Sequence, residues 1–336
     1  MAANAGTACG QALVLGASGG IGGEVARQLR DAGWQVRALK RGLESEAVER
    51  DGIAWIRGDA LDRDAVVRAA RGCGVIVHAV NPPGYRNWAE QVLPMIDNTI
   101  AAATAARATV VLPGTIYNFG PDAFPLLRED APQRPVTRKG AIRVELERRL
   151  AAASARGVRT IVVRAADFFG AHAGNNWFGQ ALVKAGRPVT AIRVPNRPGV
   201  GHQWSYVPDV ARAMVELIER RDTLEPFARF HLGGHWDADG TQLAQAVRRV
   251  AQRHGMWPAV RRFPWWLVWA GAPFVTMLRE MLEMRYLWRE PLRMDNARIK
   301  AVLGREPLTP LDTAVEAALT ELGCLHTHDA RQPRNA

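Results

Sequence analysis

Cysteine is scarce in this chain, with Cys9, Cys73 and Cys324 among its 336 residues. Three cysteines cannot form the even disulfide framework of a small secreted domain, and their spacing matches no pattern of zinc ligands. The N-terminal segment also lacks the basic start and the apolar core of a secretory signal peptide. We therefore expect a protein of the reducing cytoplasm with no bound metal.

Long apolar runs are missing as well. The longest stretch of this kind, 263–277, is too short to span a bilayer and contains two prolines. The sequence therefore predicts no transmembrane segment and allows only a weak contact with a membrane surface.

Basic residues exceed acidic ones by 11, yet no run of lysine or arginine and no nucleic-acid module is recognisable. The excess is spread over both halves of the chain, so we expect a small-molecule substrate and no nucleic-acid partner. Hydrophobic residues make up 48% of the chain, which is enough for one large domain or two joined ones. A homodimer is compatible with this composition.

The first 165 residues alternate short apolar runs with helical stretches. The apolar runs occupy 11–16, 34–39, 53–58, 74–79, 108–113 and 158–165, and the helical stretches 21–31, 62–71, 88–106 and 141–156. Continuous β-branched strands separated by helices predict a parallel sheet covered on both faces. The expected fold class is α/β, with a doubly wound domain over residues 1–166.

After residue 166 the rhythm gives way to loops rich in Gly, Pro, Asn and Trp. The pattern predicts a helix at about 209–220, a strand at 228–234, helices at 241–254, about 264–289 and 310–322, and a loose tail over 327–336. We expect residues 167–326 to form a smaller, substrate-covering part, from which the helix at 209–220 and its neighbours return to the first domain.

The first strand runs into the sequence GASGGIG, a turn with glycines at 16, 19 and 22. This turn closes a predicted strand and opens a predicted helix, which is the context that dinucleotide binding needs. Gly16 permits the tight turn, Gly19 lets backbone approach a pyrophosphate, and Gly22 lets helix and strand pack closely. The helix N-terminus then attracts the phosphates. The residues expected to contact the dinucleotide here are Gly16, Ser18, Gly19, Gly20, Ile21 and Gly22.

This glycine spacing resembles that of the extended short-chain dehydrogenase/reductases, the NAD-dependent epimerase and dehydratase family with a Rossmann domain. Further similarity lies in GDA (58–60), VIVHAV (75–80), RAADFFG (164–170) and SYVPDVARA (205–213). The resemblance implies that Asp59 and Ala60 flank the adenine. It also implies that Val80 and Asn81 line the path to the nicotinamide ribose, and that Arg164 contacts the cofactor.

The second strand ends in Lys40 and Arg41, where NAD-selective members of the resembled family carry an aspartate for the ribose 2′-hydroxyl. A carboxylate would repel a 2′-phosphate, whereas a guanidinium meets it with a charge-assisted hydrogen bond. We therefore predict NADP(H) as the preferred cofactor, with NAD(H) as the alternative.

The resembled family carries a Ser or Thr after the fifth strand and a Tyr-x-x-x-Lys on the next long helix. Thr115, in PGTIYNFG (113–120), falls on the first position, but Lys139 and Arg143 stand where the tyrosine and the lysine are expected. Their spacing of four puts both on one helix face. By resemblance, Thr115 orients the substrate oxygen and Arg143 holds the ribose.

Three interpretations of the missing phenol stay open. In the first, Lys139 replaces the tyrosine as proton donor, similar to atypical reductases related to isoflavone reductases. In the second, Tyr117 or Tyr206 supplies the phenol instead. In the third interpretation Lys139 and Arg143 only bind phosphate or solvent, and no chemistry occurs.

Aromatic residues gather after the cofactor domain, in GNNWF (174–178), GHQWSYVPD (201–209) and FPWWLVWAGAPF (263–274). They favour an apolar or aromatic substrate that a few polar groups orient. The expected substrate contacts are Asn176, Trp177, His202, Gln203 and Trp204. We assign no chemistry to RYLWREPLRM (285–294).

The leading hypothesis is an NADP(H)-dependent oxidoreductase that acts on an apolar or aromatic carbonyl or conjugated small molecule by hydride transfer. One alternative is a nucleotide-sugar epimerase or dehydratase, which the altered Tyr-x-x-x-Lys weakens. The other is a non-catalytic NADP(H)-binding redox sensor or assembly factor similar to the NmrA type.

Overall fold

The computed structural model describes residues 10–82, 87–170 and 176–325, and within these ranges eight strands form one central sheet. Its strands are β1 (Gln11–Leu15), β2 (Gln35–Lys40), β3 (Ala47–Arg50), β4 (Ile53–Arg57), β5 (Val75–His78), β6 (Thr109–Gly114), β8 (Thr160–Arg164) and β12 (Phe227–His231). They lie in the order β12-β8-β6-β5-β1-β2-β4-β3, and every pairing is parallel except that of β3 with β4 at one edge. The doubly wound α/β fold predicted from the sequence is confirmed.

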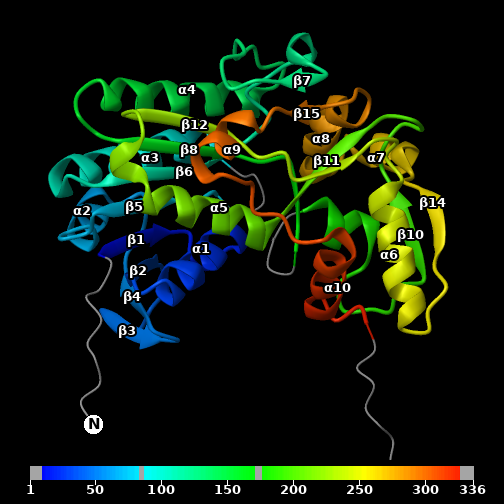
Figure 1. The fold of residues 1–336 in the computed structure, drawn as a ribbon, viewed down its shortest axis with the longest axis horizontal. Helices are drawn as coiled ribbons and strands as arrows, with labels where there is room; N and C mark the ends of the chain where they lie inside the picture. The colour runs from blue at the N-terminus through cyan, green and yellow to red at the C-terminus, as the bar shows by residue number, and fades with distance from the viewer. Residues whose placement is uncertain (1–9, 83–86, 171–175, 326–336) are drawn as a thin grey trace, which may run out of the picture.

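Helices cover both faces of this sheet (Figure 1). On one face lie α1 (Gly20–Asp31) and α5 (Val207–Glu219), whose apolar sides pack on the strands. On the other lie α2 (Arg63–Ala69), α3 (Trp88–Ala106) and α4 (Arg138–Ser154). Because both faces are covered, β5 and β8 are buried along their whole length, as their continuous apolar runs require.

The chain after β8 builds a second hydrophobic core beside the sheet (Figure 1). Three short strands form one small sheet, β9 (Asp167–Phe169), β11 (His202–Tyr206) and β13 (His235–Asp237), and β10 (Ala191–Val194) pairs with β14 (Ala259–Arg262). A π-helical turn (Phe178–Leu182), α6 (Gln242–Arg253) and α10 (Leu311–Glu321) pack around them. From this part α5, β12 and α9 (Ala297–Leu303) return to the central sheet.

The single helix predicted at about 264–289 is wrong. The structure has α7 (Trp265–Gly271), a turn, α8 (Thr276–Glu283) and a 3-10 segment (Met284–Trp288). Pro273 lies in the turn and cannot continue a helix. The chain folds back there, because a side chain at Gly271 would lie 2.5 Å from Leu278, seven residues later. After the 3-10 segment, β15 (Arg293–Met294) pairs with β7 (Leu126–Leu127).

Several smaller elements were not predicted, among them β3 and α9. Single 3-10 turns complete the described elements, at Pro121–Ala123 and Arg221–Thr223. The loose tail expected at 327–336 and the N-terminal segment with Cys9 lie outside the described residues. No helix of the described part is long and apolar enough to cross a membrane.

Candidate active site

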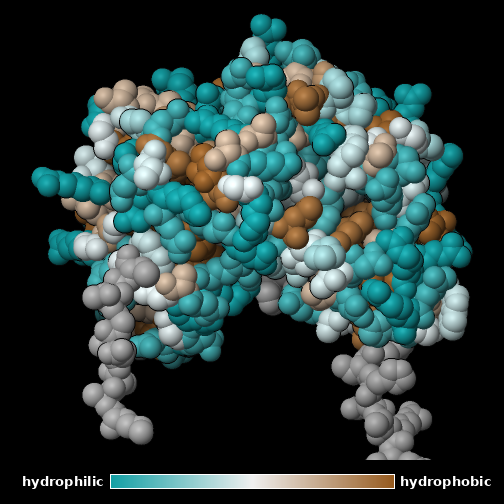
Figure 2. Space-filling view, viewed as in Figure 1, coloured by the Kyte–Doolittle hydropathy of each residue, from teal (hydrophilic) through white to brown (hydrophobic). Residues whose placement is uncertain are grey.

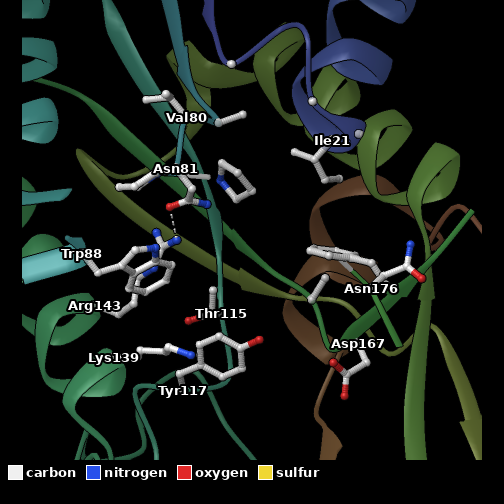
Figure 3. Close-up of a pocket in the computed structure, with 18 of the residues that line it drawn as sticks. Ile21, Val80, Asn81, Trp88, Thr115, Tyr117, Lys139, Arg143, Asp167 and Asn176 are labelled. Atoms are coloured by element: carbon white, nitrogen blue, oxygen red, sulfur yellow. Dashed lines mark hydrogen bonds between the residues drawn. The ribbon is translucent and has the colours of Figure 1, made fainter. Parts of the chain in front are cut away.

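A cleft of about 870 Å³ opens at the carboxyl ends of the parallel strands (Figure 3). It lies where the strand order reverses: the chain turns from β1 to β2 on one side, while β5 adds to the other side. Doubly wound sheets bind ligands at such a switch point, because the loops after the two central strands diverge there. Residues from β1 to β8 form one wall, and the segments 176–181 and 277–288 form the other.

The glycine turn forms one end of the cleft. Gly16 has φ +88°, and a side chain there would lie 2.4 Å from the carbonyl oxygen of Ala79. A side chain at Gly22 would lie 2.3 Å from the Gly16 carbonyl oxygen, so this glycine serves the packing of α1 on the turn. Gly19 differs, because a side chain there would meet only the Gly16 oxygen, at 3.3 Å. The open space at Gly19, facing the N-terminus of α1, fits a pyrophosphate.

Lys40 and Arg41 also line the cleft, at the carboxyl end of β2. The ammonium of Lys40 lies 5.4 Å from the ring centre of Trp55. The Arg41 guanidinium is 65% exposed and lies 3.8 Å from the carboxylate of Asp59. Asp59 and Ala60 line the same part of the cleft. The Arg41 guanidinium is therefore accessible from this part of the cleft.

Val80 and Asn81 follow β5 and face the middle of the cleft. The Asn81 side-chain oxygen accepts a hydrogen bond of 2.7 Å from the buried guanidinium of Arg143 (Figure 3). That guanidinium also lies 5.0 Å from the ring centre of Trp88. Burial and the nearby Arg143 charge lower the pKa of His78 to about 3, so this imidazole stays neutral. Arg143 is thus a fixed cation in the middle of the cleft.

Lys139 lines the cleft one helical turn before Arg143, and it is only 5% exposed. Its amine is directed toward Tyr117 and Thr115 in Figure 3, and it forms a 2.5 Å ion pair with Glu280 of α8. The helix begins close to the Tyr117 backbone, since a side chain at Gly140 would lie 2.1 Å from the Tyr117 carbonyl oxygen. The hydroxyl of Thr137 accepts a hydrogen bond from the Gly140 amide and caps the helix.

Thr115 follows β6, and its hydroxyl donates a hydrogen bond of 3.2 Å to the side-chain oxygen of Asn118. The Asn118 amide donates in turn to the buried carboxylate of Glu147. Burial raises the pKa of the Glu147 carboxyl, but the Arg164 guanidinium and the Gln133 amide lower it more, so the net pKa lies below its usual range. The loop that carries Thr115 and Tyr117 is therefore held by an ionised network beneath it.

The expectation that Arg164 contacts the cofactor is wrong. Its side chain is 1% exposed and does not line the cleft. Both of its terminal nitrogens bond the carboxylate of Glu147, at 2.7 and 3.0 Å, and one also donates to the Thr115 carbonyl oxygen. A guanidinium that is buried so fully needs this bidentate partner, so Arg164 supports the Thr115 loop from inside the core.

The five expected substrate contacts divide into two groups. Asn176 and Trp177 line the cleft, whereas His202, Gln203 and Trp204 do not. All five residues of β11 are buried, because elements cover both of its faces. Gln203 bonds the backbone at Leu232 and Met294, and Trp204 packs in the second core. The assignment of His202, Gln203 and Trp204 to the substrate is therefore wrong.

His202 does stand behind a residue of the cleft. Its ring bonds the carboxylate of Asp167 at 2.8 Å and stacks on the Trp288 ring, with 3.9 Å between ring centres. Asp167 and Trp288 themselves line the cleft. His202 thus orients one polar and one aromatic side chain of the cleft without reaching it.

The region 12–233 matches the model of the NAD dependent epimerase/dehydratase family. The chain belongs to this family. The match spans the central sheet, the glycine turn and the cleft wall that β1 to β8 provide.

Solved structures of epimerases share the fold of this epimerase/dehydratase-family chain. UDP-glucose 4-epimerase from Brucella ovis in complex with NAD is 18% identical, with a TM-score of 0.71 over 94% of this chain and 99% of that one. UDP-glucuronic acid 4-epimerase from Bacillus cereus in complex with NAD is 14% identical, with a TM-score of 0.70 over 93% of this chain and 98% of that one.

Two curated relatives are reductases. A segment of 94 residues is 38% identical to (4-alkanoyl-5-oxo-2,5-dihydrofuran-3-yl)methyl phosphate reductase of Streptomyces griseus. The segment makes up 28% of this chain and 30% of that protein. A second segment, of 103 residues, is 30% identical to 2-alkyl-3-oxoalkanoate reductase of Shewanella oneidensis. It makes up 30% of this chain and 25% of that protein. The matched segments therefore span less than a third of the relatives' own lengths.

The outer wall of this family member's cleft was not predicted from the sequence. It contains Glu280, Leu287 and Trp288 and three methionines, Met277, Met281 and Met284. The methionines recur at intervals of four and three, which places them on one helix face. This spacing is the feature of the sequence from which the apolar wall could have been predicted. Trp288 lies in the stretch 285–294 to which no chemistry was assigned. Among the described residues, no group of His, Cys, Asp or Glu is arranged to hold a metal ion.

Proposed function

We propose that this protein is an NADP(H)-dependent reductase of an apolar carbonyl or conjugated small molecule. The observation that carries the proposal is the placement of Lys139 and Arg143. Both are buried, both line the cleft, and they stand one turn apart on α4. The glycine turn forms one end of this cleft, and methionine and tryptophan side chains form the opposite wall. The dinucleotide, when bound, supplies the hydride.

The residues of the chain then have separate tasks. Arg143, held by Asn81, offers its guanidinium to the ribose next to the nicotinamide. Lys139 carries an ammonium that donates a proton to the substrate oxygen as the carbonyl is reduced. The Glu280 carboxylate orients this ammonium and is itself 26% exposed, so the resulting amine regains a proton from solvent at this point.

The cleft wall supports an alkyl-bearing or aromatic substrate. Trp177 makes a ring contact with Trp288 at 4.9 Å, and three methionines of α8 and the next turn adapt to irregular apolar shapes. Asp167 and Asn176 are two of the polar groups on that side (Figure 3). The Shewanella relative is named for a 2-alkyl-3-oxoalkanoate, a carbonyl compound with alkyl chains, and this chemistry suits such a wall.

A turnover panel tests the function. NADPH consumption is measured with 3-oxo compounds and enones that carry alkyl chains of increasing length. UDP-sugars are incubated in parallel with NAD⁺, and their epimers are separated by chromatography, because epimerisation consumes no NADPH. We expect turnover on the alkyl compounds, with a lower KM for longer chains because more apolar area is buried. Turnover of UDP-sugars alone would replace the proposal with an epimerase. Tight NADPH binding without any turnover would replace it with a sensor.

Arg41 is expected to set the choice of dinucleotide. The wild-type protein should bind NADPH more tightly than NADH, because the guanidinium can leave the distant carboxylate of Asp59 and bond a 2′-phosphate. Arg41→Asp should weaken NADPH by about one to two decades, at roughly 1.4 kcal/mol per decade. NADH affinity should change far less. Calorimetric titration of both dinucleotides measures this, and equal wild-type affinities would refute the NADP(H) assignment.

A further inference from the structure

Large apolar side chains are exposed together on α7, α8 and the turn between them. Among the described residues, eight of the twelve exposed large hydrophobics lie between 257 and 277. Trp266 is 70% and Phe274 is 88% exposed. We call six of these residues the apolar patch: Trp266, Leu267, Trp269, Phe274, Val275 and Met277. The face shown in Figure 2 is mostly hydrophilic, with apolar side chains in small groups.

The geometry of α7 explains why these side chains face outward. Trp266 and Trp269 are three residues apart and share a helix face, and Leu267 stands beside them. Val268, on the opposite side, is the buried residue of this helix. The helix is therefore amphipathic in an unusual way, because its outer side is the more aromatic one. Exposed apolar groups that are contiguous on a surface indicate an interaction site.

The charges around the apolar patch are mainly positive, and the two carboxylates that follow it on α8, Glu280 and Glu283, bond Lys139 and the Arg138 amide. The sequence from 257 to 279 contains three arginines and no aspartate or glutamate. Arg261 and Arg262 are exposed on β14, and Arg261 pairs in register with the exposed Arg193 of β10. The guanidinium of Arg285 lies 5.7 Å from the ring centre of Trp269. Aromatic rings and guanidinium groups thus stand next to each other at this surface.

We propose that the apolar patch docks on the surface of an anionic lipid bilayer. Tryptophan is favoured at the boundary between headgroups and acyl chains, and arginine bonds lipid phosphates. With seven residues, α7 is too short to cross the membrane and would lie in the boundary plane. A second copy of this chain fits less well, because a symmetric contact would bring the same arginines face to face.

The patch adjoins the mouth of the cleft. Met277 is 53% exposed, belongs to the apolar patch and lines the cleft. A docked protein would therefore present the cleft to the lipid surface, where apolar carbonyl compounds concentrate. This last step rests on the proposed function, whereas the docking itself does not.

Vesicle sedimentation tests the docking with the full chain, in the absence of nucleotide and substrate. The vesicles contain either phosphatidylcholine alone or three parts phosphatidylcholine to one part phosphatidylglycerol. We expect binding to the anionic vesicles that weakens as salt rises. Trp266→Ser/Phe274→Ser should lose about tenfold or more in affinity, because two aromatic side chains no longer enter the boundary. Arg261→Gln/Arg262→Gln should lose roughly fivefold per arginine at low salt.

The matched control is Leu61→Ser/Leu308→Ser, which removes two exposed apolar side chains outside the apolar patch. Its vesicle affinity should equal that of the wild type. The proposal is overturned if the folded wild type ignores anionic vesicles, or if Trp266→Ser/Phe274→Ser binds them as well as the control does. The proposal is also overturned if the wild type is a dimer in the ultracentrifuge and Trp266→Ser/Phe274→Ser is a monomer, because a second copy would then occupy the apolar patch. Since no turnover is measured, failure here leaves the proposed reductase activity untouched.

Discussion

Valine in place of Gly19 is expected to abolish dinucleotide binding while the fold remains intact. A Cβ at this position has one close neighbour in the protein, the Gly16 carbonyl oxygen at 3.3 Å. The backbone there, with φ −96° and ψ 174°, suits any residue. The valine side chain would instead occupy the space that a pyrophosphate needs at the N-terminus of α1. We expect NADPH affinity to fall by two decades or more, which is about 2.7 kcal/mol.

Gly16→Ala is the matched control for this experiment. Its φ of +88° and the 2.4 Å separation from the Ala79 carbonyl oxygen make any side chain there costly to the fold itself. We expect a lower free energy of unfolding, by about 2 kcal/mol or more. Calorimetry with NADPH and thermal unfolding separate the two variants. Unchanged NADPH affinity in a Gly19→Val variant of wild-type stability would disprove the assignment of the turn.

Methionine in place of Lys139 is expected to remove most of the turnover. Loss of a general acid lowers a rate by roughly 10²–10⁴, and the methionine retains the length and the apolar contacts of the lysine stem. NADPH affinity should stay within a few-fold, because the expected partner of Lys139 is the substrate. The fold should tolerate the change, since the Glu280 carboxylate that loses its partner is 26% exposed and can be solvated.

Arg143→Met is the comparison for Lys139→Met. It should weaken NADPH binding, because the Arg143 guanidinium, held by Asn81, is expected at the ribose. The double variant Lys139→Met/Glu280→Gln checks that the uncompensated carboxylate is not the cause of lost activity. The measurements are single-turnover reduction rates and calorimetric NADPH affinities. If Lys139→Met keeps turnover within threefold, Tyr117→Phe becomes the decisive variant.

Most of the residues that the sequence assigned to a dinucleotide line one cleft, and the reason is local. The glycine turn, the basic pair at 40–41 and the positions after β5 each lie at the carboxyl end of a strand of the central sheet. Parallel strands bring their carboxyl ends to one edge, so residues far apart in the chain are placed together by topology alone. The spacing of four between Lys139 and Arg143 likewise determines a shared helix face.

The substrate end could not be predicted in the same way. Whether His202 and Gln203 face a ligand depends on what covers β11, and the covering elements come from distant parts of the sequence. Arg164 was misassigned because its guanidinium bonds Glu147 of α4 in the core and therefore does not reach the cleft. The α8 wall was missed because one continuous helix was expected where the chain turns at Pro273.

The two walls of the cleft come from different parts of the chain, and this has a consequence for redesign. Residues at the ends of β1, β2 and β5 provide the end of the cleft with the glycine turn, while 277–288 provide most of the apolar wall. The apolar wall could be exchanged for that of a relative, with the end that carries the glycine turn left in place. Several contacts join the two walls, and the one that reaches the cleft lysine is the ion pair between Lys139 and Glu280. Any exchanged segment must therefore bring a carboxylate to position 280, or the lysine on α4 loses the group that orients it.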